Sequence, residues 1–341
     1  MDVKTAVKAI RKGEPASVYL LYGTEKYSIK QFTDVLKEQL IEEEHRDFAI
    51  ASYDTAETPI EQIIEEAETV PFLVPRKLVF VRDHYLFTAG KENTKIEHKM
   101  ETLLTYLDNP ADYSILIFLV QGEKLDERKK IVKTIKSKAT VLSFGPIHGE
   151  ELTSWLVKQA AARKVTMQQS AAETLIQRAG TSLQTLSAEV DKLCLYAGEG
   201  GTLSSINVED LVARNTEQNI FAMIEDIANL RLGKALDIFY ELLKQREEPI
   251  KIAALISRQF RIILQVKELG AQSYSQQQIA SQLGLHPYAV KIAGEQSRKF
   301  QSDRLRLILK HLAELDYQMK TGAIDKVLGL ELFLLRLGSD S

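Results

Sequence analysis

Apolar residues gather in short runs along the first part of the chain, and these runs alternate with segments of helical periodicity. Five runs rich in apolar and β-branched residues are expected to form strands, at 17–22, 47–53, 77–82, 114–120 and 139–144. Between them, apolar residues recur three and four positions apart, as in amphipathic helices, at 32–40, 60–67 and 100–107. This alternation predicts a five-stranded parallel sheet with helices on both faces.

The strand pattern ends at Gly145 and Pro146, and only helical patterns follow. We therefore expect an α/β domain over 1–145, followed by all-α structure. Two apolar stripes predict a small helical domain over 146–214. Longer amphipathic segments predict a third, all-helical domain over 215–341, with helices at 220–230, 234–246, 249–269 and 302–315.

Composition narrows the class of protein. Of 341 residues, 45% are hydrophobic and 27% are charged, which is typical of soluble globular domains. The net charge of −3 gives no overall attraction to nucleic acid, so such a contact needs a local basic patch. The single cysteine, Cys194, lies between leucines on a helical stretch and is expected to pack in a core. Without a signal-peptide core or a membrane-length apolar run, the expected localisation is cytoplasmic, with no membrane partner.

The loop after the first strand is where a parallel sheet of this kind would bind phosphates. A P-loop needs the pattern G-x-x-x-x-G-K-[ST], because glycines let backbone amides face the phosphates. Here Gly23 is the single glycine of the loop, and Glu25 would place a carboxylate against the phosphates. The third strand of such an ATPase ends in paired acids for Mg²⁺ and water, but this strand ends in Arg82 and Asp83. The sequence predicts an ATPase-like scaffold that does not bind nucleotide.

Other catalytic arrangements find no support in the sequence. The six histidines have no metal-ligand spacing with one another or with Cys194. Neither a G-x-S-x-G elbow nor a Cys/His pairing occurs. We therefore expect no catalytic residue, no cofactor and no metal site, and a protein that is not an enzyme by its own residues.

Two prolines frame a short loop between the second predicted helix and the third predicted strand. Pro71 and Pro75 each disfavour helical geometry in the residue before them, so the helix should end ahead of the loop. Between them, Phe72 and Leu73 place an aromatic beside an aliphatic residue, as in an anchor that fills a pocket on a partner. In the alternative interpretation, which the residues alone favour, both side chains tuck under the edge of the sheet.

A basic helical segment follows the fourth predicted strand. Its apolar stripe is separate from most of its cations, which are Arg128, Lys129, Lys130, Lys133, Lys136 and Lys138. Such a face can follow a nucleic acid backbone through salt-sensitive phosphate contacts. The simpler interpretation is a solvated helix face.

The segment 278–290 has the spacing of a helix-turn-helix, with a small Ala280, a turn at Gly284 and an apolar Val290. That motif would make the protein a sequence-specific DNA-binding regulator. The second helix offers only Tyr288 and Lys291 to a groove, so we favour a helical hairpin within the last domain.

Several of these stretches, in the same order, resemble the δ subunit family of bacterial DNA polymerase III. The resemblance extends over nearly the whole chain and is carried by the residues at 18–25, 71–79, 124–130, 180–193, 283–288 and 320–322. It implies an AAA+-like first domain without a functional nucleotide site, a small helical lid and a helical collar that joins a ring of subunits.

Further expectations follow from the resemblance alone. The chain would be a clamp loader subunit of the DNA-directed DNA polymerase III holoenzyme, nucleoid-associated during replication. It would bind the β sliding clamp and open one clamp interface, so that the clamp can be loaded on primed DNA. The clamp-binding residues would be Phe72 and Leu73, with Val70 and Val74 beside them. The possible contacts with the DNA backbone would be Arg128, Lys129, Lys130 and Lys133.

The partners implied are the β sliding clamp, the τ/γ and δ′ subunits through the collar, and primer-template DNA within the assembly. ATP would be bound by neighbouring motor subunits. Two alternatives stay open at this point. One is an ATP-binding AAA+ replication motor or helicase loader, and the other is the helix-turn-helix regulator.

Overall fold

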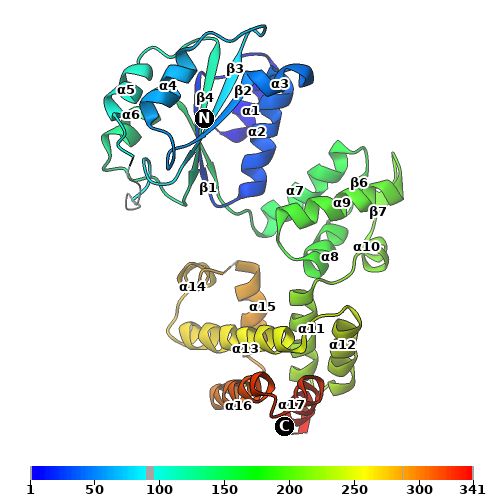
Figure 1. Cartoon of the computed structure of the whole chain (residues 1–341). Helices are drawn as coiled ribbons and strands as arrows, with labels where there is room; N and C mark the ends of the chain where they lie inside the picture. Colours follow the sequence, from blue (N-terminus) through cyan, green and yellow to red (C-terminus); the bar gives the residue numbers. More distant parts are fainter. Residues whose placement is uncertain (1, 90–95, 286, 340–341) are drawn as a thin grey trace. The chain divides into compact units, whose positions relative to one another are not determined.

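Five parallel strands form the sheet in the first part of the chain, in the order β2-β3-β4-β1-β5 (Figure 1). The computed structural model describes residues 2–89, 96–285 and 287–339. The strands are β1 (Val18–Gly23), β2 (Ile50–Asp54), β3 (Lys77–Asp83), β4 (Ser114–Gln121) and β5 (Thr140–Phe144). All four pairs of neighbouring strands are parallel, which confirms the predicted five-stranded parallel sheet.

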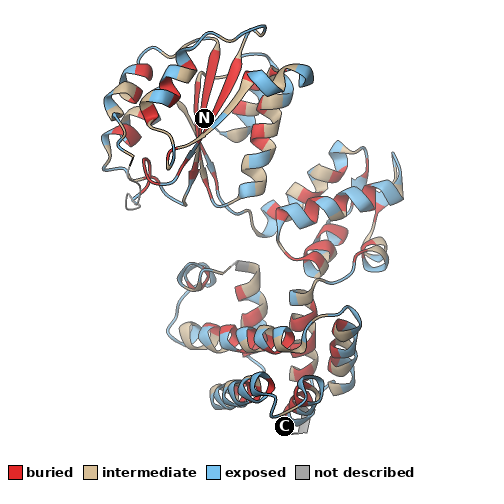
Figure 2. Ribbon diagram, in the orientation of Figure 1, coloured by how far each residue is buried: buried red, intermediate tan, exposed pale blue. Residues whose placement is uncertain are grey.

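Helices cover both faces of this sheet and bury an apolar core against each. The two helices on one face are α1 (Val3–Arg11) and α2 (Lys26–Leu40). Those on the other face are α4 (Ile60–Glu68), α5 (Met100–Tyr106) and α6 (Lys130–Lys138). Successive strand residues alternate between the two cores: Tyr19 faces α1 and α2, whereas Leu20 faces α4 to α6. Burial on both faces explains the near-continuous apolar runs of the strands (Figure 2).

Two features of the first part differ from the sequence prediction. The strand predicted over 47–53 begins only at Ile50, because the residues before it form η1 (Glu43–His45) and α3 (Arg46–Ala49). Ile50 pairs with Leu78, the second residue of β3, so residues before Ile50 have almost no partner strand. In addition, α1 lies outside the predicted elements. The side chain of Asp2 caps it by accepting a hydrogen bond of 2.7 Å from the backbone N–H of Thr5.

The segment after Pro146 folds into helices and one small strand pair. The helices are α7 (Gly149–Ala162), α8 (Gln169–Ala179), α9 (Leu183–Ala197) and α10 (Ser205–Leu211). The strands β6 (Thr166–Met167) and β7 (Thr202–Leu203) pair in parallel and were not predicted. Cys194 is buried as expected, and this burial raises the pKa of its thiol above the ordinary value.

Seven helices follow in the described part of the chain. They are α11 (Thr216–Ala228), α12 (Leu232–Lys244), α13 (Pro249–Ala271), α14 (Gln276–Leu283), α15 (Pro287–Ser297), α16 (Ser302–Thr321) and α17 (Lys326–Ser339). The predicted helices are confirmed, although α11 and α12 end about two residues early. Leu230 and Arg246, predicted as their last residues, instead have positive φ angles of 59° and 63°, a left-handed conformation that ends a helix.

The chain folds into two units, Met1–Pro146 and Ile147–Ser341. The boundary between the two units lies between residues 146 and 147. The further division of the second unit at residue 214 stays a prediction. None of the helices in the described ranges combines the length and the apolar character needed to span a membrane.

Candidate functional site

An apolar loop stands out from the surface of the first unit. This loop, residues 69–76, joins α4 to β3 and is called the docking loop below. The side chains of Val70, Phe72 and Leu73 are 71%, 77% and 72% exposed. The interpretation in which Phe72 and Leu73 tuck under the sheet edge is therefore wrong. Three large apolar side chains exposed together on one loop form a patch of the kind that contacts a partner.

Val74 faces the opposite way from its two neighbours. It is half-buried and packs against the apolar core under α1 and α2. Of the four apolar residues expected to bind the partner, the structure thus brings three to the surface and uses the fourth as an internal anchor. No sequence pattern separates these roles, because the four residues share the same loop.

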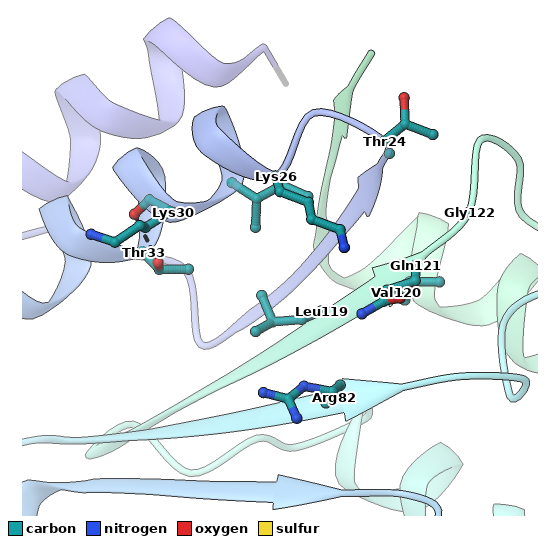
Figure 3. Close-up of a pocket in the computed structure, with 11 residues that line it drawn as sticks. Thr24, Lys26, Lys30, Thr33, Arg82, Leu119, Val120, Gln121 and Gly122 are labelled. Atoms are coloured by element: carbon teal, nitrogen blue, oxygen red, sulfur yellow. Dashed lines mark hydrogen bonds between the residues drawn. The ribbon is translucent and has the colours of Figure 1, made fainter. Parts of the chain in front are cut away.

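A pocket of about 510 Å³ lies at the carboxyl ends of the strands, where a nucleotide would be expected. Lys26 reaches toward it from α2, and Arg82 from β3 (Figure 3). Leu119 and Ile29 add apolar surface, and no acidic side chain of the described chain lines it. The pocket therefore offers cations but no carboxylate ligand for Mg²⁺.

Gly23 at this pocket is required by packing within the sheet. Its φ of +141° is a conformation that other residues rarely adopt, and an added Cβ would lie 2.0 Å from the carbonyl oxygen of Phe144. The side chain of Glu25 then accepts a hydrogen bond of 3.2 Å from the backbone N–H of Tyr27, at the start of α2. A carboxylate thus occupies the helix end where a P-loop would hold phosphates.

Asp83 is fully buried and its carboxylate is used within the fold. Its Oδ1 accepts hydrogen bonds from the hydroxyl of Thr55 at 3.3 Å, and from the backbone N–H groups of Tyr85 at 3.3 Å and Leu86 at 2.8 Å. Its Oδ2 accepts another, of 3.2 Å, from the N–H of Phe87. These four hydrogen bonds fix the turn after β3.

Asp54, at the end of β2, is a partly buried acid that lies close to two side chains at this turn. Its Oδ2 lies 3.1 Å from Nε2 of His84 and 3.7 Å from a guanidinium nitrogen of Arg82. Partial burial alone would raise the pKa of Asp54, but the N–H of Ala56 and these two side chains together lower it. Asp54 is therefore held as a carboxylate by its own neighbours.

Two of the four candidate DNA contacts in the basic segment before and within α6, Arg128 and Lys129, make hydrogen bonds within the first unit. The guanidinium of Arg128 makes two hydrogen bonds to Asp126, of 2.8 and 2.9 Å, which hold the pKa of that carboxyl at about 2. Nζ of Lys129 donates to the carbonyl of Tyr85 at 2.6 Å. Lys130 and Lys133 are exposed, and their ammonium groups have no hydrogen-bond or ion-pair partner among the residues that the structure describes.

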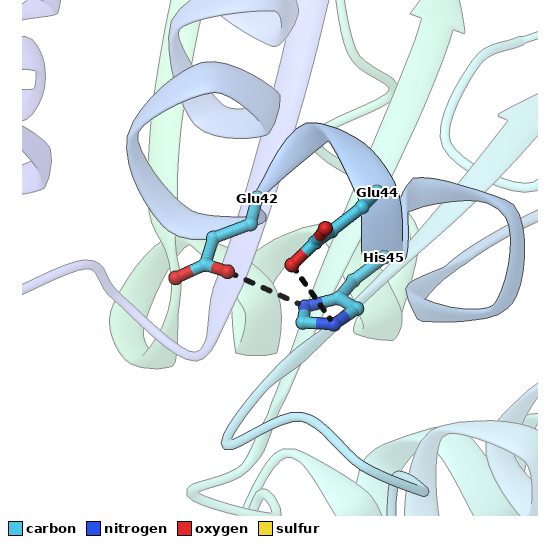
Figure 4. Close-up of side chains that lie close together, drawn as sticks. All are labelled: Glu42, Glu44 and His45. Atoms are coloured by element: carbon cyan, nitrogen blue, oxygen red, sulfur yellow. Dashed lines mark ion pairs between the residues drawn. The ribbon is translucent and has the colours of Figure 1, made fainter.

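Glu42, Glu44 and His45 come together at η1, an arrangement that histidine spacing alone did not predict (Figure 4). Both nitrogens of the His45 ring lie 3.7 Å from a carboxylate oxygen. The two acids are exposed, and exposed acids often gather in this way without a metal. We assign no metal to this group.

The hairpin of α14 and α15 packs within the helical bundle, as favoured from the sequence. Ile279, Ala280 and Val290 are buried in the core of the second unit. Tyr288 and Lys291 line a pocket of about 300 Å³ formed with α7 and α8, and burial raises the pKa of the Tyr288 phenol. The two residues that a recognition helix would need are thus directed at the chain itself.

Comparison with known proteins places the chain in a family. The family model "DNA polymerase III, delta subunit" matches residues 19–145, and "DNA polymerase III delta subunit, C-terminal domain" matches residues 217–337. The DNA polymerase III subunit delta of Bacillus subtilis (strain 168) is 43% identical over 330 residues, which cover 97% of this chain and 95% of that protein.

One further relative and one solved structure agree with this assignment. A probable DNA polymerase III subunit delta of Aquifex aeolicus (strain VF5) is 24% identical over 249 residues, covering 70% of this chain and 67% of that protein. The solved structure of the Bacillus subtilis DNA clamp loader delta protein is similar with a TM-score of 0.84 and 43% identity, covering 99% of each chain. The chain therefore belongs to the family of DNA polymerase III delta subunits, the clamp loader delta proteins.

Proposed function

We propose that this clamp loader subunit binds the β sliding clamp through the docking loop and opens one interface of the clamp ring. The observation that carries the proposal is the exposure of Phe72 and Leu73 on a loop in which the next residue, Val74, is anchored in the core. An aromatic residue that enters a pocket on a partner commonly contributes about 2 kcal/mol or more to binding. Val70 would extend the same contact, and Val74 would hold the loop in place.

Opening the ring needs no bond chemistry by this chain. A ligand that binds the open clamp more tightly than the closed clamp shifts the ring toward the open state. Moving a clamp from mostly closed to mostly open takes a difference in binding free energy of about 5.5 kcal/mol. An apolar anchor with a rigid domain behind it can supply such a difference if the open interface offers additional contacts.

We propose further that this chain neither binds nor hydrolyses ATP and depends on neighbouring motor subunits for it. Three features support this: Glu25 at the start of α2, Asp83 fully engaged in the turn, and no acid around the pocket in the described part of the chain. The rival function, an AAA+ motor or helicase loader, requires nucleotide binding by the isolated chain. Calorimetry with ATP and Mg²⁺ discriminates the two, because only the rival predicts saturable heat.

The last helices are proposed to join the other clamp loader subunits, τ/γ and δ′. Leu328, Leu332 and Leu335 are exposed on α17 at positions four and three residues apart, so they form one apolar stripe. Leu307 and Tyr317 of α16 are exposed as well. Such a surface suits contact with similar helices of neighbouring subunits.

Within the assembled loader, Lys130 and Lys133 are the proposed contacts with primer-template DNA. Each ammonium that meets a phosphate releases a counterion, which makes binding depend on salt. Replacing both lysines with glutamine should reduce the slope of log affinity against log salt by roughly 2 for primed DNA. The same change at Arg128 and Lys129, which are bonded internally, should alter the slope less.

A surface-binding measurement tests the proposed function. The purified chain is passed over immobilised β clamp in buffer without nucleotide. We expect saturable binding that ATP leaves unchanged, because the docking loop needs no nucleotide to be exposed. Absence of binding at micromolar chain concentrations would argue against the proposal.

A further inference from the structure

The two ends of the docking loop are connected by hydrogen bonds from a buried lysine and a tyrosine that lie outside the loop. The loop begins at the end of α4, where the last carbonyl groups of a helix lack partners within the helix. Thr69 satisfies part of this need: its N–H donates to the carbonyls of Glu65 and Glu66 at 3.0 and 3.1 Å. The remaining partners come from outside the helix.

Lys77 supplies one of them from the far end of the loop, where β3 begins. Its side chain is 6% exposed, which is rare for a lysine without a specific role. Nζ donates to the carbonyl oxygen of Glu66 and, at 2.9 Å, to Oε1 of the same residue. A positive charge at this place also interacts favourably with the negative end of the helix.

Tyr113, just before β4, connects to both ends of the loop. Its hydroxyl donates to the carbonyl of Glu68 at 2.6 Å, at the end of α4. Its own carbonyl accepts a hydrogen bond of 2.9 Å from the backbone N–H of Lys77. The start and the end of the docking loop are therefore fixed to the same residue.

The conformation inside the loop agrees with this restraint. Leu73 has a φ of +61°, a left-handed conformation that costs an ordinary residue roughly 1–2 kcal/mol. Such a conformation persists when the surroundings fix it. Val74 packs inward next to it, and the guanidinium of Arg76 donates to the carbonyl of Gly13 at 3.1 Å.

We propose that Lys77 and Tyr113 are positioning residues that hold the docking loop in its binding conformation before the clamp arrives. This inference rests on the proposed function of the loop. A loop ordered in advance loses less conformational freedom on binding. If these hydrogen bonds are removed, only a fraction of the molecules present Phe72 and Leu73 correctly, and the apparent affinity is reduced to that fraction of its original value.

Association and dissociation rates on immobilised clamp separate positioning from contact. Lys77→Met removes the charge and keeps the length of the side chain, and Tyr113→Phe removes one hydroxyl. We expect the apparent association rate to fall about tenfold for Lys77→Met and about threefold for Tyr113→Phe, with the dissociation rate unchanged. Amide hydrogen exchange over 69–76 should become faster in both variants. Lys158→Met and Tyr196→Phe, exposed positions in the second unit, are the matched controls.

Each outcome has a separate meaning. Unchanged association and unchanged exchange in Tyr113→Phe and Lys77→Met, with normal binding by the parent chain, would overturn the positioning role and leave the proposed function intact. A faster dissociation rate instead would make the two residues direct contacts, which also contradicts the inference. If Lys77→Met fails to fold, the Tyr113→Phe result decides, since that change removes a single hydroxyl. Failure of the parent chain to bind would reject the proposed function itself.

Discussion

Replacing both Phe72 and Leu73 with alanine is expected to abolish binding to the β clamp while the fold stays intact. If each side chain contributes about 2 kcal/mol as an interface anchor, losing both weakens binding by roughly a factor of 1,000. Both side chains are more than 70% exposed in the free chain, so their loss removes little internal packing. The unfolding free energy should therefore change by less than about 0.5 kcal/mol.

The control for this variant is a substitution of similar size elsewhere. Leu195 on α9 is 85% exposed, and Leu195→Ala should bind the clamp like the parent chain. Surface binding gives the affinity, and thermal unfolding followed by circular dichroism checks the fold. Unchanged affinity of the double variant would show that the clamp-binding site lies elsewhere on the chain.

Asp83→Asn is expected to destabilise the first unit by about 2–4 kcal/mol. The carboxylate accepts four hydrogen bonds in a fully buried position, and an asparagine keeps only one acceptor oxygen. Buried N–H groups left without an acceptor each cost roughly 1–3 kcal/mol. Calorimetric unfolding should show the transition of the first unit at a clearly lower temperature.

Asp54→Asn is the matched comparison, since Asp54 ends the neighbouring strand and is only partly buried. Its ion pairs are near the surface, where such pairs contribute about 1 kcal/mol or less. If Asp83 were instead a Mg²⁺ ligand of a working ATPase, its substitution would leave stability nearly unchanged and abolish nucleotide hydrolysis. That result would favour the rival function, an ATP-binding AAA+ motor or helicase loader.

The sheet could be predicted from the sequence because strands buried on both faces carry long apolar runs, as in β4 (Ser114–Gln121). The exact start of β2 could not be predicted, because it depends on where β3 begins and offers a strand to pair with. The ends of α11 and α12, two residues before the predicted Leu230 and Arg246, were missed for a different reason. A left-handed residue without glycine leaves little local signal.

The candidate site was only partly accessible to sequence reasoning. Prolines at 71 and 75 locate the loop, but the residues alone favour burial of the Phe-Leu pair under the sheet. Its exposure depends on Val74 taking the inward position. Lys77 and Tyr113 lie 36 positions apart in sequence, and their contact depends on β3 and β4 being neighbours. The hydrogen bond from Nζ of Lys129 to the carbonyl of Tyr85 is likewise a contact between residues far apart in sequence.

We propose that binding by this chain alone opens the clamp. A clamp that carries a self-quenching pair of fluorophores across one interface, titrated with the purified chain in the absence of ATP, tests this directly. We expect a saturable rise in fluorescence with the parent chain, and no rise with the Phe72→Ala, Leu73→Ala variant. Fluorescence that stays quenched while the parent chain is bound, or that rises only with ATP, would contradict it.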